Sequence, residues 1–170
     1  MSVMTLRTFC DALESAIAAV AGALLAALLV PVTIQVFARL IPGFDAPLWT
    51  EEAARFLLVW TIMVGSMLAL RRSANFVVDL LPGLSSRGTA WLDRLALLVV
   101  LFFGAFTSWW GIDFVAFGWN QTSETADWPM WWVFIAWPVA GVVWMLFAFD
   151  ALKHGFPARN DGAPPQDMTA

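Results

Sequence analysis

One segment constrains this chain more than any other, the stretch 49–81 with the sequence WTEEAARFLLVWTIMVGSMLALRRSANFVVDLL. It carries no charge from Phe56 to Leu70, and with the two alanines before Arg55 the apolar run is about as long as a membrane-crossing helix requires. Charged residues flank the run on both sides: Glu51, Glu52 and Arg55 before it, Arg71 and Arg72 after it. The segment therefore predicts a transmembrane helix with an acidic end and a basic end.

Composition extends this prediction to the whole chain. Of its 170 residues, 61% are hydrophobic and only 13% are charged, whereas soluble domains are close to half apolar and about a quarter charged. Eleven Trp and fourteen Phe suit a lipid interface, and a net charge of −4 without a basic cluster argues against nucleic acid as a partner. One cysteine, Cys10, and one histidine, His154, are too few for a haem pair, a zinc site or a disulfide, so we expect no cofactor.

Three further apolar stretches are long enough to cross a bilayer. We therefore expect an all-α integral membrane protein with four transmembrane helices, at about residues 15–38, 50–70, 91–117 and 129–150. These form one domain, residues 1–154, followed by a flexible tail, residues 155–170. The apolar residues after Arg72 are too few to span, so an interfacial segment is expected between the second and third helices. Pro31 is expected to kink the first helix.

The distribution of Lys and Arg predicts the topology. The two tails and the middle connection hold most of the basic residues: Arg7, Arg71, Arg72, Arg87, Arg94, Lys153 and Arg159. Only Arg39 and Arg55 fall on the other side, so the positive-inside rule places both termini in the cytoplasm. The outer side then holds most of the tryptophans, including Trp131 and Trp132, either as an aromatic belt alone or also as a docking surface.

The acidic residues lie near the ends of the spans. At these positions a helix-end or ion-pair role is favoured over a proton relay, and Arg55 is spaced to pair with Glu51 or Glu52 on one helix face. Thr50 is a candidate N-cap for the second helix. No acid lies in the middle of a span, where a self-sufficient carrier would place its coupling site. Gly65 and Gly104 are predicted to let helices approach closely.

The second helix also carries a resemblance to a known family. Its segments EEAARFLLVW, GSMLALRR and VDLL resemble the signature of the small membrane subunit of tripartite ATP-independent periplasmic (TRAP) transporters, and WPMWWVFIAWPVAG resembles the last span of that family. The resemblance covers roughly residues 10 to 152. Two departures from the family pattern are Asn75, where a His or Glu is often found, and a more acidic third loop, NQTSETADWP.

The resemblance implies a three-part transporter. A soluble periplasmic binding protein captures an organic acid, a large multi-span permease moves it, usually with sodium, and the small subunit has no catalytic centre. The small subunit would extend the fixed scaffold of the permease in the bacterial inner membrane and offer part of the docking surface for the binding protein. The matching interaction residues are Glu51, Glu52, Arg55, Arg71, Arg72 and Asp79, and Trp131 and Trp132 lie in the matching part of the last span.

Two other classes of protein fit parts of the sequence. A stand-alone Trp-rich membrane protein that binds a ligand is similarly small and aromatic, but it would have five spans. A small four-helix exporter would carry a membrane Glu inside a span, away from its end. Neither alternative needs a large membrane partner, so transport or tight ligand binding by the chain alone would favour them.

Overall fold

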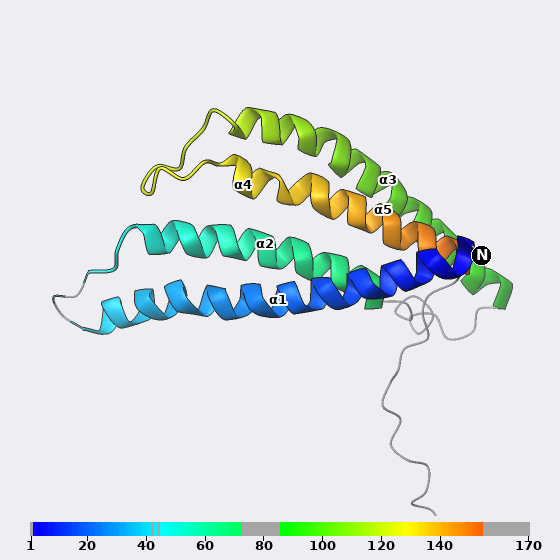
Figure 1. Cartoon of the computed structure of the whole chain (residues 1–170), viewed down its shortest axis with the longest axis horizontal. Helices are drawn as coiled ribbons and strands as arrows, with labels where there is room; N and C mark the ends of the chain where they lie inside the picture. Colours follow the sequence, from blue (N-terminus) through cyan, green and yellow to red (C-terminus); the bar gives the residue numbers. More distant parts are fainter. Residues whose placement is uncertain (1, 42, 44, 73–85, 155–170) are drawn as a thin grey trace, which may run out of the picture.

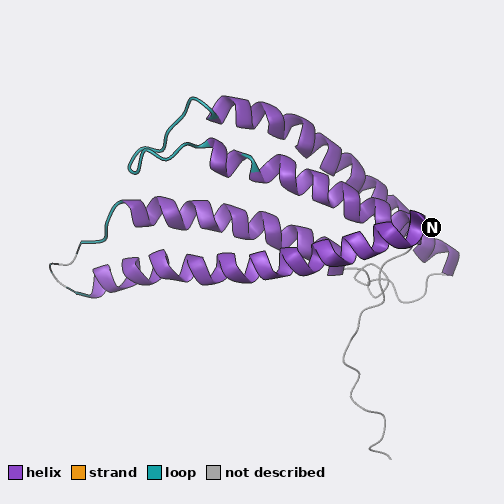
Figure 2. Cartoon of the chain, viewed as in Figure 1, coloured by secondary structure: helices purple, strands orange, loops and turns teal. Residues whose placement is uncertain are grey.

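The described part of the chain is helical. The computed structural model describes residues 2–41, 43, 45–72 and 86–154. Its helices are α1 (Ser2–Leu40), α2 (Trp49–Arg72), α3 (Ser86–Gly118), α4 (Trp131–Phe134) and α5 (Ala136–His154) (Figure 2). Within the described residues, four helical stretches are long and apolar enough to cross a membrane. The short α4 and the adjoining α5 together make up the fourth stretch. The predicted all-α architecture with four spans is thus confirmed, while the expected interfacial segment and flexible tail lie outside the described residues.

The helices form a row in the order α1, α2, α5, α3. Within the described residues α1 packs mainly on α2, α3 packs on α5, and α2 packs on α5, whereas α3 contacts neither α1 nor α2. The two helical hairpins converge at the end where the chain begins and spread apart at the opposite end (Figure 1). Both faces of the row therefore remain open, which suits a protein surrounded by lipid or by another membrane subunit.

The two prolines within the spans have different effects. Helix α1 continues through Pro31 without interruption, so the expected kink does not break this helix. In the fourth span α4 ends at Phe134, whose carbonyl oxygen would accept a hydrogen bond from residue 138 in a continuous helix. Residue 138 is a proline and has no N–H to donate, which explains why the helix is interrupted between Phe134 and Ala136.

Glycines set the close approach of α3 and α5. A Cβ atom on Gly111 would lie 2.7 Å from Cδ of Pro138, and one on Gly141 would lie 2.6 Å from the carbonyl oxygen of Gly104. Atoms of the neighbouring helix occupy the space that a Cβ atom would take at each glycine, which confirms the close approach predicted at Gly104. Gly65 on α2 differs, because a Cβ atom there would meet nothing within 4 Å. The close helix approach predicted at Gly65 is therefore not found within this chain.

Candidate functional site

A buried arginine joins three helices at the end of the row where α1 begins, which we call the Arg71 end. The Arg71 side chain is only 2% exposed. Its Nη1 donates to Oδ2 of Asp150 at 2.5 Å, and its Nη2 donates to Oδ1 of Asp11 at 2.6 Å. Its Nε lies 3.5 Å from Oε2 of Glu14. The planar guanidinium fork thus faces carboxylates from α1 and from α5 at once.

The positions of these residues in their helices explain the meeting. Arg71 lies in the last turn of α2, and Asp11 and Glu14 are three residues apart, so they share the face of α1 that meets α2. Asp150 lies one turn after Phe147, whose ring centroid is 5.4 Å from Cζ of Arg71. The guanidinium of Arg71 thus lies over a buried aromatic ring while its N–H groups reach the carboxylates.

Arg72 is placed very differently from its neighbour. Its side chain is 58% exposed, and its Nε donates to Oε1 of Glu14 at 3.2 Å. This exposed pair adds to the group formed by Arg71, Asp11, Glu14 and Asp150, which together with Arg72 we call the Arg71 cluster. Arg71 and Arg72 look alike in the sequence, but the first side chain is buried and the second is exposed.

A second polar contact lies at the other end of α2, which we call the Glu52 end. The Glu52 carboxylate is buried and accepts a hydrogen bond from the Ser123 hydroxyl. It also accepts from the backbone N–H groups of Thr125 and Ala126, both at 2.8 Å. Three donors from one loop thus satisfy a buried carboxylate. We call this set the Glu52 contact, and it attaches the connection between α3 and α4 to α2.

The attached connection has an ordered backbone. Ser123 N–H donates to the carbonyl oxygen of Trp128 at 2.8 Å, and Met130 N–H donates to that of Gln121 at 3.0 Å. Asp127 adopts a φ of 53° within the turn that the bond between Ser123 and Trp128 closes. The loop 120–130 is therefore a small hairpin. Backbone hydrogen bonds join its two arms, and its turn is bonded to Glu52.

The remaining predicted interaction residues at this end are on the surface. Arg55 Nη2 lies 3.3 Å from Oε1 of Glu51, and both side chains are largely exposed. The predicted pairing of Arg55 is thus made with Glu51, since Glu52 is engaged by the loop. Thr50 is not an N-cap, because its hydroxyl donates back to the carbonyl oxygen of Pro47 at 2.7 Å and does not accept from a helix N–H. Asp79 lies outside the described residues.

The tryptophans of the Glu52 end stack on one another. Trp131 stacks on Trp119 and on Trp132, with ring centroids 5.4 and 4.9 Å apart. The indole N–H of Trp60 donates to the carbonyl oxygen of Trp132 at 2.9 Å, which joins α2 to α4. Phe56 and Trp128 also touch edge to face. Aromatic contacts therefore continue the connection between the hairpins that the Glu52 contact begins.

Several participants could not be recognised in the sequence. In the sequence Asp150 is one more acid near the end of a span, and Asp11 and Glu14 are acids before the expected first span. The three-residue spacing of Asp11 and Glu14 is the one signal that they share a helix face. Ser123 and the loop amides carry no sequence signal for a carboxylate, since two of the three donors belong to the backbone.

The arrangement holds the four spans together. Charged and polar contacts join the two hairpins at both ends of α2, and glycines bring α3 and α5 together between them. In a comparison with known protein families, residues 28–157 match the model of "Tripartite ATP-independent periplasmic transporters, DctQ component". A search of curated proteins found no match.

Proposed function

The chain belongs to the DctQ family of tripartite ATP-independent periplasmic transporters, and from this we propose that it is the fixed membrane scaffold beside the large permease subunit and part of the surface on which the periplasmic binding protein docks. As a DctQ component it is a small permease subunit and not an enzyme. It is a multi-pass protein of the inner membrane.

The Arg71 cluster is the observation that carries the scaffold role. A support beside a moving permease domain has to resist displacement of its own helices. Arg71 contacts Asp11 on α1 and Asp150 on α5, so separating the hairpins at this end would pull the buried Asp150 carboxylate away from the Arg71 guanidinium. The Glu52 contact opposes separation at the other end. The two contacts favour a rigid support over a mobile carrier.

The docking role is supported by the loop 120–130. Its fixed hairpin shape means that a partner would not have to order it, which lowers the entropic cost of binding. Trp119 precedes the loop and Trp128 lies within it, and both are exposed; large aromatic side chains are common anchors in protein interfaces. The loop lies at the Glu52 end, as does the connection between α1 and α2 (Figure 1).

Topology and transport chemistry complete the proposal. The start of α1 and the end of α5 lie together at the Arg71 end (Figure 1), which supports a topology with both termini on one side; by the positive-inside rule that side would be cytoplasmic. The Glu52 end then faces the periplasm, where the binding protein is found.

In line with the family resemblance, the complex would import an organic acid (carboxylate) by sodium symport, with substrate choice made by the other two components.

Charge reversal tests the scaffold role. In cells that make all three components, the double variant Arg71→Glu, Arg72→Glu should reduce the amount of large permease that co-purifies with the small subunit and reduce uptake, with an unchanged order of preference among carboxylates. Arg94→Glu is the matched control, because Arg94 is an exposed arginine at the same end on α3. Unchanged co-purification together with unchanged uptake would refute the scaffold role.

A second measurement isolates docking. The variant Glu52→Gln replaces one of the two acceptor oxygens by an NH2 group that cannot accept from the loop, so part of the Glu52 contact is lost and the loop should loosen. The affinity of the assembled membrane complex for its binding protein should fall while co-purification of the large permease stays the same. If the loop is loosened and the affinity is unchanged, the loop is not part of the docking surface.

A further inference from the structure

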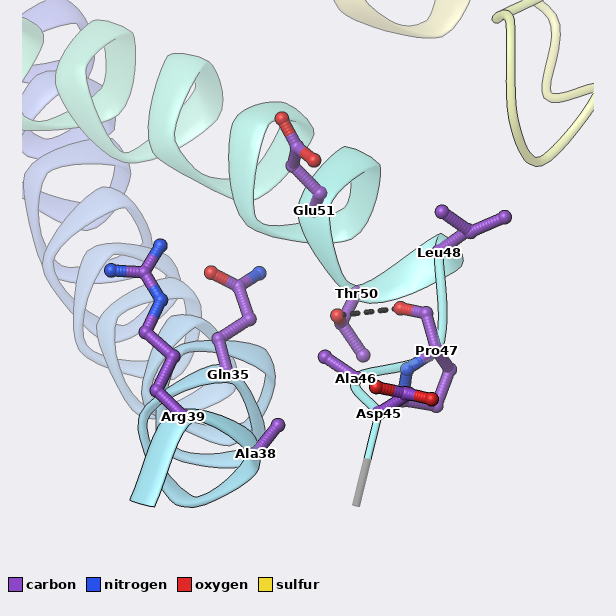
Figure 3. A pocket seen from close by; sticks show the side chains of 9 residues that line it. All are labelled: Gln35, Ala38, Arg39, Asp45, Ala46, Pro47, Leu48, Thr50 and Glu51. Atoms are coloured by element: carbon purple, nitrogen blue, oxygen red, sulfur yellow. Dashed lines mark hydrogen bonds between the residues drawn. The ribbon is translucent and has the colours of Figure 1, made fainter. Parts of the chain in front are cut away.

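A polar pocket lies between the last turns of α1 and the first turn of α2. Its volume is about 460 Å³, and the chain from Asp45 to Leu48 forms one wall. Figure 3 shows Gln35 and Arg39 rising side by side from α1, with Glu51 above them on α2 and Asp45 on the connecting segment. The pocket is separate from the Arg71 cluster and from the Glu52 contact, and the proposed function assigns it no role.

Two of the polar side chains around the pocket already have partners. The Glu51 carboxylate is paired with Arg55 at 3.3 Å, and the Thr50 hydroxyl is bound to the carbonyl oxygen of Pro47. Arg39 and Asp45 differ, because within the described part of the chain neither has a salt-bridge partner within 4.0 Å, and they do not reach each other. One positive and one negative group thus line the same pocket with space between them.

Gln35 adds an unused donor to the positive side. Its Nε2 atom is buried and has no hydrogen-bond partner among the described residues, although Gln35 lines the pocket. An unsatisfied buried amide is costly, and a ligand oxygen would relieve that cost. Gln35 and Arg39 are four residues apart on one helix face, so turning the Gln35 amide about its last side-chain bond would place its donor on the side of the Arg39 guanidinium, where both can reach one anion.

The pocket also lies at a defined depth. It is formed where the apolar stretch of α1 ends and that of α2 begins, with Trp49 at the first turn. Helix ends bounded by tryptophan and arginine mark the headgroup layer of a bilayer. A ligand that carries a phosphate and an ammonium group is therefore present at this depth in the form of a zwitterionic phospholipid.

We propose that this pocket binds the headgroup of a phospholipid of the ethanolamine class. The phosphate accepts hydrogen bonds from the Arg39 guanidinium and the Gln35 amide, and the primary ammonium donates to the Asp45 carboxylate. A glycerol headgroup leaves the Asp45 charge uncompensated beside an anion, and a choline headgroup has no N–H to donate. The site does not depend on the proposed transport function, since it requires only this chain and a bilayer.

Lipid titration of the purified full-length chain tests the proposal. Phosphatidylethanolamine, phosphatidylglycerol and phosphatidylcholine are added in separate titrations in a mild detergent. Native mass spectrometry counts the lipid molecules bound at each concentration. The wild-type chain should bind one phosphatidylethanolamine about tenfold more tightly than the other two lipids, as expected for a charge-assisted hydrogen bond. An equal affinity for all three lipids would overturn the assignment.

Two variants and two controls locate the site. Arg39→Gln should weaken binding of phosphatidylethanolamine about tenfold, and Asp45→Asn should remove the preference over phosphatidylglycerol. Both residues are exposed, so folding should be retained, which circular dichroism verifies. Arg94→Gln and Asp113→Asn change exposed charges outside the pocket and should behave as wild type. Pocket variants that match these controls would refute the site.

A soluble competitor distinguishes the source of the headgroup. Glycerophosphoethanolamine carries the same phosphate and ammonium groups but no acyl chains. It should not displace the bound lipid at equal concentration, because the acyl chains hold the headgroup at the pocket. Displacement at equal concentration would show that the pocket takes a soluble zwitterion and would overturn its assignment to a membrane lipid.

Discussion

Replacing Arg71 by leucine should destabilise the protein far more than the same change at Arg72. Asp150 is only 2% exposed, and the variant would remove its closest cationic partner, at 2.5 Å, from this dry environment. Breaking a buried ion pair by removing one partner costs about 3–5 kcal/mol. Asp11 is 57% exposed, so water can take over its solvation and it should add little to this cost.

Arg72→Leu is the matched control. It removes an exposed contact to Glu14, and exposed ion pairs contribute about 0–1 kcal/mol. The double variant Arg71→Leu, Asp150→Leu tests the cause, because it removes both buried charges together. It should recover a large part of the stability that Arg71→Leu loses, since an apolar pair in place of a buried ion pair is often neutral.

The assay is unfolding of the full-length chain from a mild detergent by titration with sodium dodecyl sulfate, followed by tryptophan fluorescence. The expected order of stability is wild type, then Arg72→Leu close to it, then the double variant, then Arg71→Leu at least 2 kcal/mol below Arg72→Leu. The reasoning is refuted if the two single variants are equally stable, or if the double variant is no more stable than Arg71→Leu.

Three further changes follow from other contacts. Gly141→Ala should lower the free energy of unfolding by about 1–3 kcal/mol, because the added methyl group would meet α3, whereas Gly65→Ala should not lower it; equal effects would contradict the packing argument. Glu52→Gln should speed amide hydrogen exchange in the loop 120–130 by about tenfold or more, and unchanged protection would show that Glu52 does not hold the loop. Trp60→Phe should cost about 0.5–1.5 kcal/mol through loss of the bond to the Trp132 carbonyl, and a neutral result would mean that this bond adds nothing.

The spans could be predicted from sequence because their length and charge limits come from the bilayer itself. The stretch from Ala53 to Leu70 is long and apolar enough to predict a membrane helix without knowledge of the rest of the fold. The rotation of that helix could not be predicted in the same way. A helix that is apolar nearly all round has no dominant polar face, so its sequence does not say which side packs on α1 and which on α5.

Two pairs of neighbouring residues show what this ambiguity costs. Glu51 and Glu52 are adjacent and identical in chemistry, yet one is exposed beside Arg55 and the other is buried under a loop. Arg71 and Arg72 divide in the same manner. Consecutive residues differ by about 100° around a helix, so only the tertiary packing decides which member of each pair becomes buried.

The partners of the buried residues were beyond sequence reasoning for another reason. Asp150 follows Arg71 by 79 residues, and no local spacing rule connects positions so far apart. The donors to Glu52 include two backbone amides, which every residue other than proline possesses. The ends of the spans could thus be identified as charged, while the contacts made by those charges required the fold.

The order of synthesis gives the Arg71 cluster one more consequence. Asp11 and Glu14 emerge from the ribosome first, Arg71 follows with α2, and Asp150 comes with the last helix. Until α5 has entered the membrane, the arginine can meet only the two acids of α1. A chain that stops before Asp150 therefore carries an incomplete charge network, which gives the cell's quality-control proteases a physical difference between a finished subunit and a fragment.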